Sequence, residues 1–132
     1  MSSQLGQIRV ALAQINPKVG DLEANANLVR EYANKTTAAG AQIVLFPEMV
    51  LTGYPVEDLA LRKTFRNASI NAVKKLASDI ASDGNGELLA AIGYLDESSN
   101  GKPQNAVAFI YNGTVVAKYI DRKSTRLNSS HT

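Results

Sequence analysis

The spacing of apolar residues changes twice in the first part of the chain. Residues 7–15 alternate with the two-residue period of a strand. Residues 22–33 repeat at three- and four-residue intervals, which indicates an amphipathic helix, and Asp21 and Gly40 suit its two ends. Residues 42–46 are a short apolar run, which predicts a strand buried on both faces. Together these segments predict a β-α-β unit with parallel strands.

The second half of the chain predicts further helix and strand. Glu57 and Asp58 suit the first turn of a short helical region, and a longer helix is expected from about residue 68 to 82. The Asn112-Gly113 pair predicts a tight hairpin turn. Three segments have strand character: residues 88–95, 105–111 and 114–120. The fold class is therefore α/β, with the order β-α-β-α-β followed by a β-hairpin.

Composition narrows the range of functions. The sequence contains no cysteine among its 132 residues, so neither a disulfide nor a cysteine nucleophile can be built from it. The net charge of +2 comes from residues 121–132, and the rest of the chain has no basic stripe, so we expect no nucleic-acid partner. The absence of a long apolar run predicts no membrane span, and we expect a cytoplasmic protein.

Glu48 follows the buried run and Pro47, at the carboxyl end of a predicted parallel strand. Open α/β sheets bind their ligands at this end of the strands. The apolar neighbours of Glu48 would reduce the solvation of its carboxylate, as suits a general base. A glutamate after a strand-ending proline can also be a solvated loop residue. Glu48 is the candidate catalytic residue.

The tripeptide Gly53-Tyr54-Pro55 follows Glu48 closely. It is either a simple turn or a loop in which the Tyr54 hydroxyl hydrogen-bonds a ligand. The only histidine is His131, so neither a Ser-His-Asp triad nor a multi-histidine metal site can be formed. No cofactor-binding or metal-binding residue is predicted.

Three stretches of the sequence match a known family: VALAQINPKVGDLEANANLV, FPEMVLTGYPVEDLALR and NAVAFIYNGTVVAKY. They resemble the nitrilase-like glutaminase domain of glutamine-dependent NAD synthetases, within the carbon–nitrogen hydrolase superfamily. The resemblance covers about residues 7–120. The string Gly-Tyr-Pro-x-Glu-Asp-Leu favours the NAD synthetase branch.

The resemblance implies a partial α-β-β-α sandwich and a Glu-Lys-Cys triad. A cysteine would attack the side-chain amide of glutamine, Glu48 would act as base, and a lysine would stabilise the oxyanion. Tyr54 would line the glutamine pocket. Ammonia would then pass to a C-terminal synthetase domain, which uses ATP and Mg²⁺ to convert nicotinate adenine dinucleotide to NAD. A homo-oligomer is implied for the full-length enzyme.

The sequence departs from the family pattern near its end. The family lysine falls two residues after Tyr119, where this chain has Asp121, and the cysteine is absent. We therefore expect residues 1–120 to be the N-terminal part of a glutaminase domain, inactive by itself and with an exposed apolar face. Residues 121–132, DRKSTRLNSSHT, resemble an in-frame sequencing adapter and are expected to form a non-native, disordered tail.

Two other functions stay open at this stage. The first is a stand-alone nitrilase-type amidase of similar fold that acts on another small amide. The second is a non-catalytic binding or assembly module that retains the sheet without the chemistry.

Overall fold

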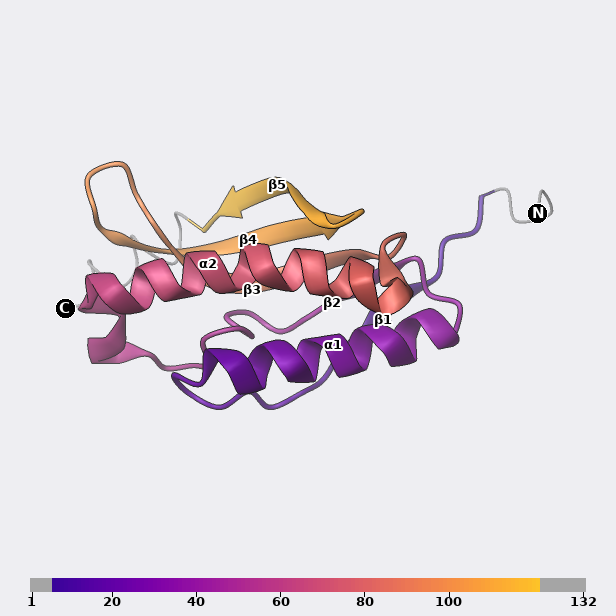
Figure 1. Cartoon of the computed structure of the whole chain (residues 1–132), viewed down its shortest axis with the longest axis horizontal. Helices are drawn as coiled ribbons and strands as arrows, with labels where there is room; N and C mark the ends of the chain where they lie inside the picture. The colour runs from indigo at the N-terminus through magenta and orange to yellow at the C-terminus, as the bar shows by residue number, and fades with distance from the viewer. Residues whose placement is uncertain (1–5, 122–132) are drawn as a thin grey trace.

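The computed structural model describes residues 6–121, which form a five-stranded sheet and two long helices (Figure 1). The elements in chain order are β1 (Val10–Leu12), α1 (Leu22–Ala38), β2 (Ile43–Leu45), the 3₁₀ helix η2 (Glu57–Leu61), α2 (Lys63–Ile80), the π-helical turn η3 (Ala81–Asn85), β3 (Leu89–Glu97), β4 (Pro103–Tyr111) and β5 (Thr114–Ile120). The predicted disordered tail lies outside the described residues, except for Asp121.

The strands lie side by side in chain order, from β1 to β5. β1, β2 and β3 are parallel, whereas β4 and β5 are antiparallel to their neighbours. This arrangement confirms the predicted α/β order with an antiparallel hairpin at one edge. Asn112 and Gly113 both have positive φ, at 55° and 84°, as the predicted hairpin turn requires.

The two long helices differ in how well their sequence pattern locates them. α1 begins where predicted, because the Asp21 carboxylate accepts a hydrogen bond from the Ala24 amide at 3.0 Å. α2 begins at Lys63, ahead of the predicted start at residue 68. The first turns of α2 bury the polar residues Arg66 and Ser69, at 6% and 0% exposure. The spacing of apolar residues therefore does not reveal this part of the helix.

Both helices cover the same face of the sheet (Figure 1). Val44 on this face is fully buried, whereas its neighbour Leu45 on the opposite face is 39% exposed. The prediction that the strand at residues 42–46 is buried on both faces is therefore wrong, because the described residues leave the second face partly uncovered. Val10 and Leu12, at 48% and 69% exposure, extend this open apolar face, as expected for a partial domain.

Asp96 is a buried carboxylate on the face that the helices cover, at 5% exposure. It accepts hydrogen bonds from the Tyr94 hydroxyl at 2.8 Å and the Glu97 amide at 2.7 Å, and it pairs with the Lys118 ammonium at 2.9 Å. Burial would raise the pKa of Asp96, but these three donors outweigh it and hold that pKa below its ordinary value.

Replacing Lys118 by methionine is expected to destabilise the fold and make it more sensitive to acid. A carboxylate with a depressed pKa contributes stability above its unfolded pKa of about 3.9, and loses that contribution as the pH falls through its folded pKa. K118M should cost about 1–3 kcal/mol at pH 7 and raise the midpoint pH of acid unfolding, as measured by circular dichroism. The control K75M removes only an exposed pair with Asp79 and should cost less than about 1 kcal/mol. Equal losses of stability in K118M and K75M would contradict the role of Lys118 as the partner of the buried Asp96 carboxylate.

Candidate active site

The turn that carries Glu48 lies beside β3, in the space that β2 leaves when it ends. The Phe46 amide donates to the Ala91 carbonyl at 3.2 Å, and the Leu51 amide donates to the Gly93 carbonyl at 3.0 Å. A Cβ atom at Gly93 would clash with the backbone nitrogen of Met49. The missing side chain of Gly93 therefore allows the turn to rest directly on β3.

Asn25 holds the same turn from the other side. It is 1% exposed, and its side-chain amide nitrogen donates to the carbonyls of Lys18 at 2.7 Å and Leu51 at 2.9 Å. Its side-chain oxygen accepts from the Lys18 amide at 2.7 Å. A buried polar residue with every side-chain contact directed at backbone fixes loop geometry. The sequence signal for it was a polar residue on the buried stripe of α1, four positions before Val29.

Glu48 itself is exposed, because the residues that follow it turn inward. Met49, Val50 and Leu51 are 3%, 0% and 0% exposed and pack into the interior. Met49 has a φ of 56°, which is unusual for a residue other than glycine and sets the tight curvature of the turn. The expectation that the apolar neighbours would desolvate the Glu48 carboxylate is therefore wrong for this chain. The turn presents that carboxylate to a cavity instead.

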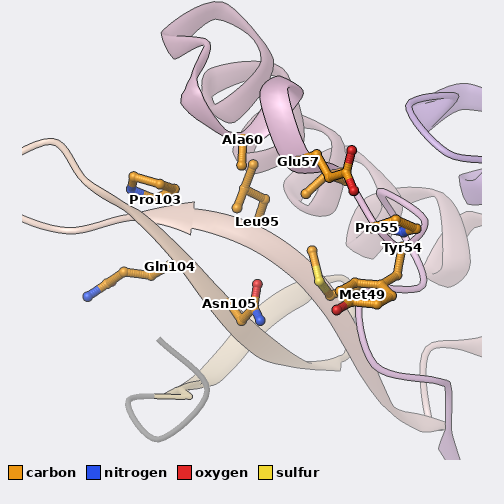
Figure 2. A pocket seen from close by; sticks show the side chains of 10 residues that line it. Met49, Tyr54, Pro55, Glu57, Ala60, Leu95, Pro103, Gln104 and Asn105 are labelled. Atoms are coloured by element: carbon orange, nitrogen blue, oxygen red, sulfur yellow. The ribbon is translucent and has the colours of Figure 1, made fainter. Parts of the chain in front are cut away.

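Glu48 and Tyr54, the two residues singled out from the sequence, line the same cavity of about 160 Å³ together with Met49 and Asn105. A larger cavity of about 470 Å³ shares Met49, Tyr54 and Asn105 and extends toward η2 and the start of β4 (Figure 2). Tyr54 is 75% exposed, so its ring covers one side of this space as a surface wall. The structure thus brings both predicted residues to one site at the carboxyl end of β2.

Asn105 is a site residue that the sequence did not single out. It lies at the start of β4, and its side chain reaches the cavities that Glu48 and Tyr54 line. A carboxamide offers both a hydrogen-bond donor and an acceptor to a ligand. Nothing in the strand pattern of residues 105–111 distinguishes a cavity-lining asparagine from an ordinary strand residue.

The backbone of residue 121 lies next to Asn105. The Asp121 amide donates to the Asn105 carbonyl at 2.9 Å, which fixes the backbone of residue 121 beside a cavity-lining residue. This is the position where the resemblance implies a lysine. Lys118, the nearest preceding lysine, instead pairs with Asp96 on the face covered by the helices. Among residues 6–121, no group of three potential ligands is placed to hold a metal ion, and no helix is long and apolar enough to cross a membrane.

Comparison with known proteins agrees with the fold. The carbon-nitrogen hydrolase family model matches residues 9–127. The chain belongs to this family of hydrolases.

The chain is similar in sequence to glutamine-dependent NAD(+) synthetases. It is 37% identical over 113 residues to a glutamine-dependent NAD(+) synthetase from Rhodobacter capsulatus, covering 85% of this chain and 19% of the relative. It is 32% identical over 113 residues to the Thermotoga maritima protein of the same name, again covering 19% of the relative. The chain therefore spans about a fifth of these proteins and corresponds to their N-terminal region.

Solved structures support the same fold. A glutamine-dependent NAD(+) synthetase from Cytophaga hutchinsonii superimposes with a TM-score of 0.77 at 24% identity, covering 86% of this chain and 19% of that one. An amidase from Nesterenkonia sp. superimposes with a TM-score of 0.70 at 20% identity and covers 42% of that chain. At these identities the likeness concerns the fold alone.

Proposed function

We propose that this chain is the N-terminal part of the glutaminase domain of a glutamine-dependent NAD synthetase, and that Glu48 is its general base. The observation that carries the proposal is that Glu48 and Tyr54 line one cavity, and that the backbone of residue 121 is hydrogen-bonded to Asn105, which lines the same cavity. Glu48 and Tyr54 are six positions apart, whereas position 121 is more distant in the sequence. The fold brings the backbone of residue 121 next to Asn105, which lines the same cavity as Glu48 and Tyr54.

The proposed chemistry is hydrolysis of the side-chain amide of glutamine. Glu48 accepts the proton of a cysteine thiol and the sulfur attacks the amide carbon. Glu48 then returns the proton to the amide nitrogen, so that the C–N bond breaks, ammonia leaves and a thioester remains. Glu48 then activates a water molecule, which releases glutamate. A lysine at position 121 would stabilise the oxyanion, whereas Asp121 has the opposite charge. The exposed Glu48 carboxylate is accessible to these groups from the cavity.

Tyr54 is proposed to form the outer wall of the glutamine site. Its exposed ring and hydroxyl lie over the cavity that Glu48 enters. A side chain with an apolar body and a polar end suits a ligand that has an apolar stem and a charged amino-acid head. Asn105, on the other side of the cavity, supplies an amide for the same purpose.

The remaining parts of the proposed reaction belong to a longer protein. A C-terminal synthetase domain would bind ATP and Mg²⁺ and use the ammonia to convert nicotinate adenine dinucleotide to NAD. We also propose a cytoplasmic location and a homo-oligomeric full-length enzyme. The relatives of about five times the aligned length support a larger partner domain.

The two alternative functions have less support. A stand-alone amidase is favoured only by likeness of fold, at 20% identity. The sequence relatives above carry the name glutamine-dependent NAD(+) synthetase at 32% and 37% identity. A non-catalytic module would not require a carboxylate to face a cavity at the end of the parallel strands.

The 132-residue chain alone is expected not to hydrolyse glutamine. Base catalysis is worth about 10²–10⁴-fold and does not replace a nucleophile. Ammonia release from glutamine, measured with a coupled glutamate dehydrogenase assay, should equal the rate in buffer. Turnover that E48Q abolishes would contradict this expectation and show that the chain has a nucleophile of its own.

A further inference from the structure

We infer that Arg66 is a positioning residue that holds together two walls of the larger cavity beside Glu48. One wall is η2, which contributes Glu57 and Ala60, and the other is the start of β4, which directly follows the β3–β4 connection at residues 98–102. This inference rests on the proposed function, because it assigns the cavity to the glutamine substrate. Arg66 does not itself line the cavity, and it acts through the segments that it bonds.

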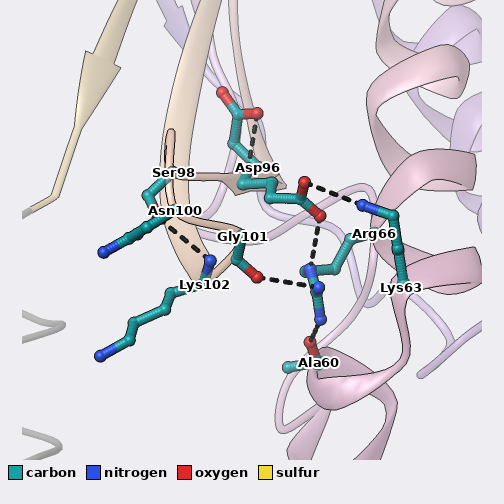
Figure 3. Close-up of polar contacts among 9 residues, drawn as sticks. Ala60, Lys63, Arg66, Asp96, Ser98, Asn100, Gly101 and Lys102 are labelled. Atoms are coloured by element: carbon teal, nitrogen blue, oxygen red, sulfur yellow. Dashed lines mark hydrogen bonds and ion pairs between the residues drawn. The ribbon is translucent and has the colours of Figure 1, made fainter.

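The Arg66 guanidinium makes three hydrogen bonds in three directions (Figure 3). Nε donates to the Glu97 carboxylate at 2.9 Å. Nη1 donates to the Ala60 carbonyl at 3.0 Å, and Nη2 donates to the Gly101 carbonyl at 2.9 Å. Ala60 and Gly101 are 41 positions apart in the sequence, and the Arg66 side chain links their carbonyls.

The position of these carbonyls connects Arg66 to the cavity. Ala60 itself lines the cavity, and Gly101 lies two residues before Pro103, which lines the facing wall with Gln104 and Asn105. A displacement of either carbonyl therefore changes the width of the cavity. Asn105 also lies in the smaller cavity with Glu48, so the same displacement reaches the candidate catalytic carboxylate.

Burial and charge make this link strong. Arg66 is 6% exposed, so its hydrogen bonds are shielded from water. Hydrogen bonds from Arg66, and to a lesser extent from Lys63, hold the pKa of Glu97 below its ordinary value. Lys63 contacts the same carboxylate at 3.3 Å, but its side chain is 67% exposed and it donates to neither carbonyl. Lys63 therefore provides a matched control for Arg66.

The planar fork of arginine is essential to this role. A guanidinium presents donors in a fixed geometry, whereas a lysine ammonium is a single point on a flexible stem. Arg66→Lys should keep the charge and the pair with Glu97 while losing the link between the two carbonyls. This conservative variant separates the positioning role from a general contribution of charge to stability.

Hydrogen exchange followed by mass spectrometry on the 132-residue chain tests the link without a ligand. The reporters are the amides of Leu59 and Arg62 in and after η2 and of Ser98 and Gly101 in the β3–β4 connection, each bonded within its own segment. R66K should speed exchange in both segments by about tenfold, the effect of losing a hydrogen bond to a charged donor. K63M should leave both at the wild-type rate. Exchange unchanged in R66K, or equally fast in K63M, would overturn the inference.

A second arm adds glutamine and separates the inference from the proposed function. Glutamine should slow exchange in both segments of the wild type and of K63M, and R66K should need about tenfold more glutamine for the same protection. Equal protection in R66K would overturn the positioning role. No protection in the wild type would instead contradict glutamine binding by this chain, and the ligand-free exchange would still decide whether Arg66 links the walls.

Discussion

Replacing Gly93 by alanine is expected to destabilise the chain by about 1–3 kcal/mol and to displace the turn that carries Glu48. The added methyl group would occupy the space of the Met49 backbone nitrogen. Hydrogen bonds on both sides of the turn resist its displacement. The Leu51 amide donates to the Gly93 carbonyl, and the Leu51 carbonyl accepts from the Asn25 side chain. The strain should therefore move the turn as a unit and separate it from β3.

Equilibrium urea denaturation of the wild type and G93A measures this effect. Gly86→Ala is the matched control, since a Cβ atom there would lie 3.6 Å from the Ala81 Cβ, an ordinary contact, at a φ of −63°. The control should stay within about 0.5 kcal/mol of the wild type. A G93A chain as stable as the control would show that the turn does not rest on β3 as described.

The architecture could be predicted from the sequence because it depends on local periodicity. Each of the first three elements has its own local pattern. Alternation at residues 7–15 predicts a strand, helical spacing after Asp21 predicts a helix, and the apolar run at residues 42–46 predicts the next strand. The hairpin turn at Asn112-Gly113 could also be predicted, because few pairs of adjacent residues both tolerate positive φ. These signals are contained within short segments.

The burial of the second sheet face could not be predicted in the same way. An apolar run records which residues favour burial, but it does not record what covers them. Leu45 and Leu12 are as apolar as Val44, yet they lie on the face that the described residues leave open. Their sequence is typical of a strand covered on both sides, whereas residues 6–121 supply a helical layer on one side only.

The candidate site was predicted in part. Glu48 and Tyr54 were found because chemistry in α/β sheets gathers at the carboxyl ends of parallel strands. Asn25, Arg66 and Asn105 were missed, since their roles depend on contacts between distant segments. A buried polar residue on an otherwise apolar helix stripe is the one signal that could have indicated Asn25. Arg66 has no such local signal.

Glu48→Gln is expected to have the largest effect of any substitution in this chain, provided that the rest of the active site is present. Joining residues 9–120 to the remainder of the Rhodobacter capsulatus relative, in place of its matching segment, would supply the rest of a carbon-nitrogen hydrolase domain. Glu48 would then face the groups that it is proposed to serve. Loss of the base should lower glutamine hydrolysis by about 10²–10⁴-fold.

Two controls make this comparison specific. Glu87→Gln removes an exposed carboxylate that precedes β3, at the opposite end of the parallel strands, and should change glutamine hydrolysis by less than about twofold. NAD formation from added ammonia should be the same in the parent chimera and both variants, because the proposed synthetase reaction does not use Glu48. This second activity reports whether each chimera is folded.

The rate of glutamine hydrolysis by the chimera, with and without Glu48→Gln, therefore decides whether Glu48 is the general base. We expect hydrolysis in the parent chimera and a loss of about 10²–10⁴-fold in E48Q, with ammonia-dependent NAD formation intact in both. Hydrolysis by E48Q at the rate of the parent, or a chimera that makes NAD from ammonia without hydrolysing glutamine, would contradict this expectation.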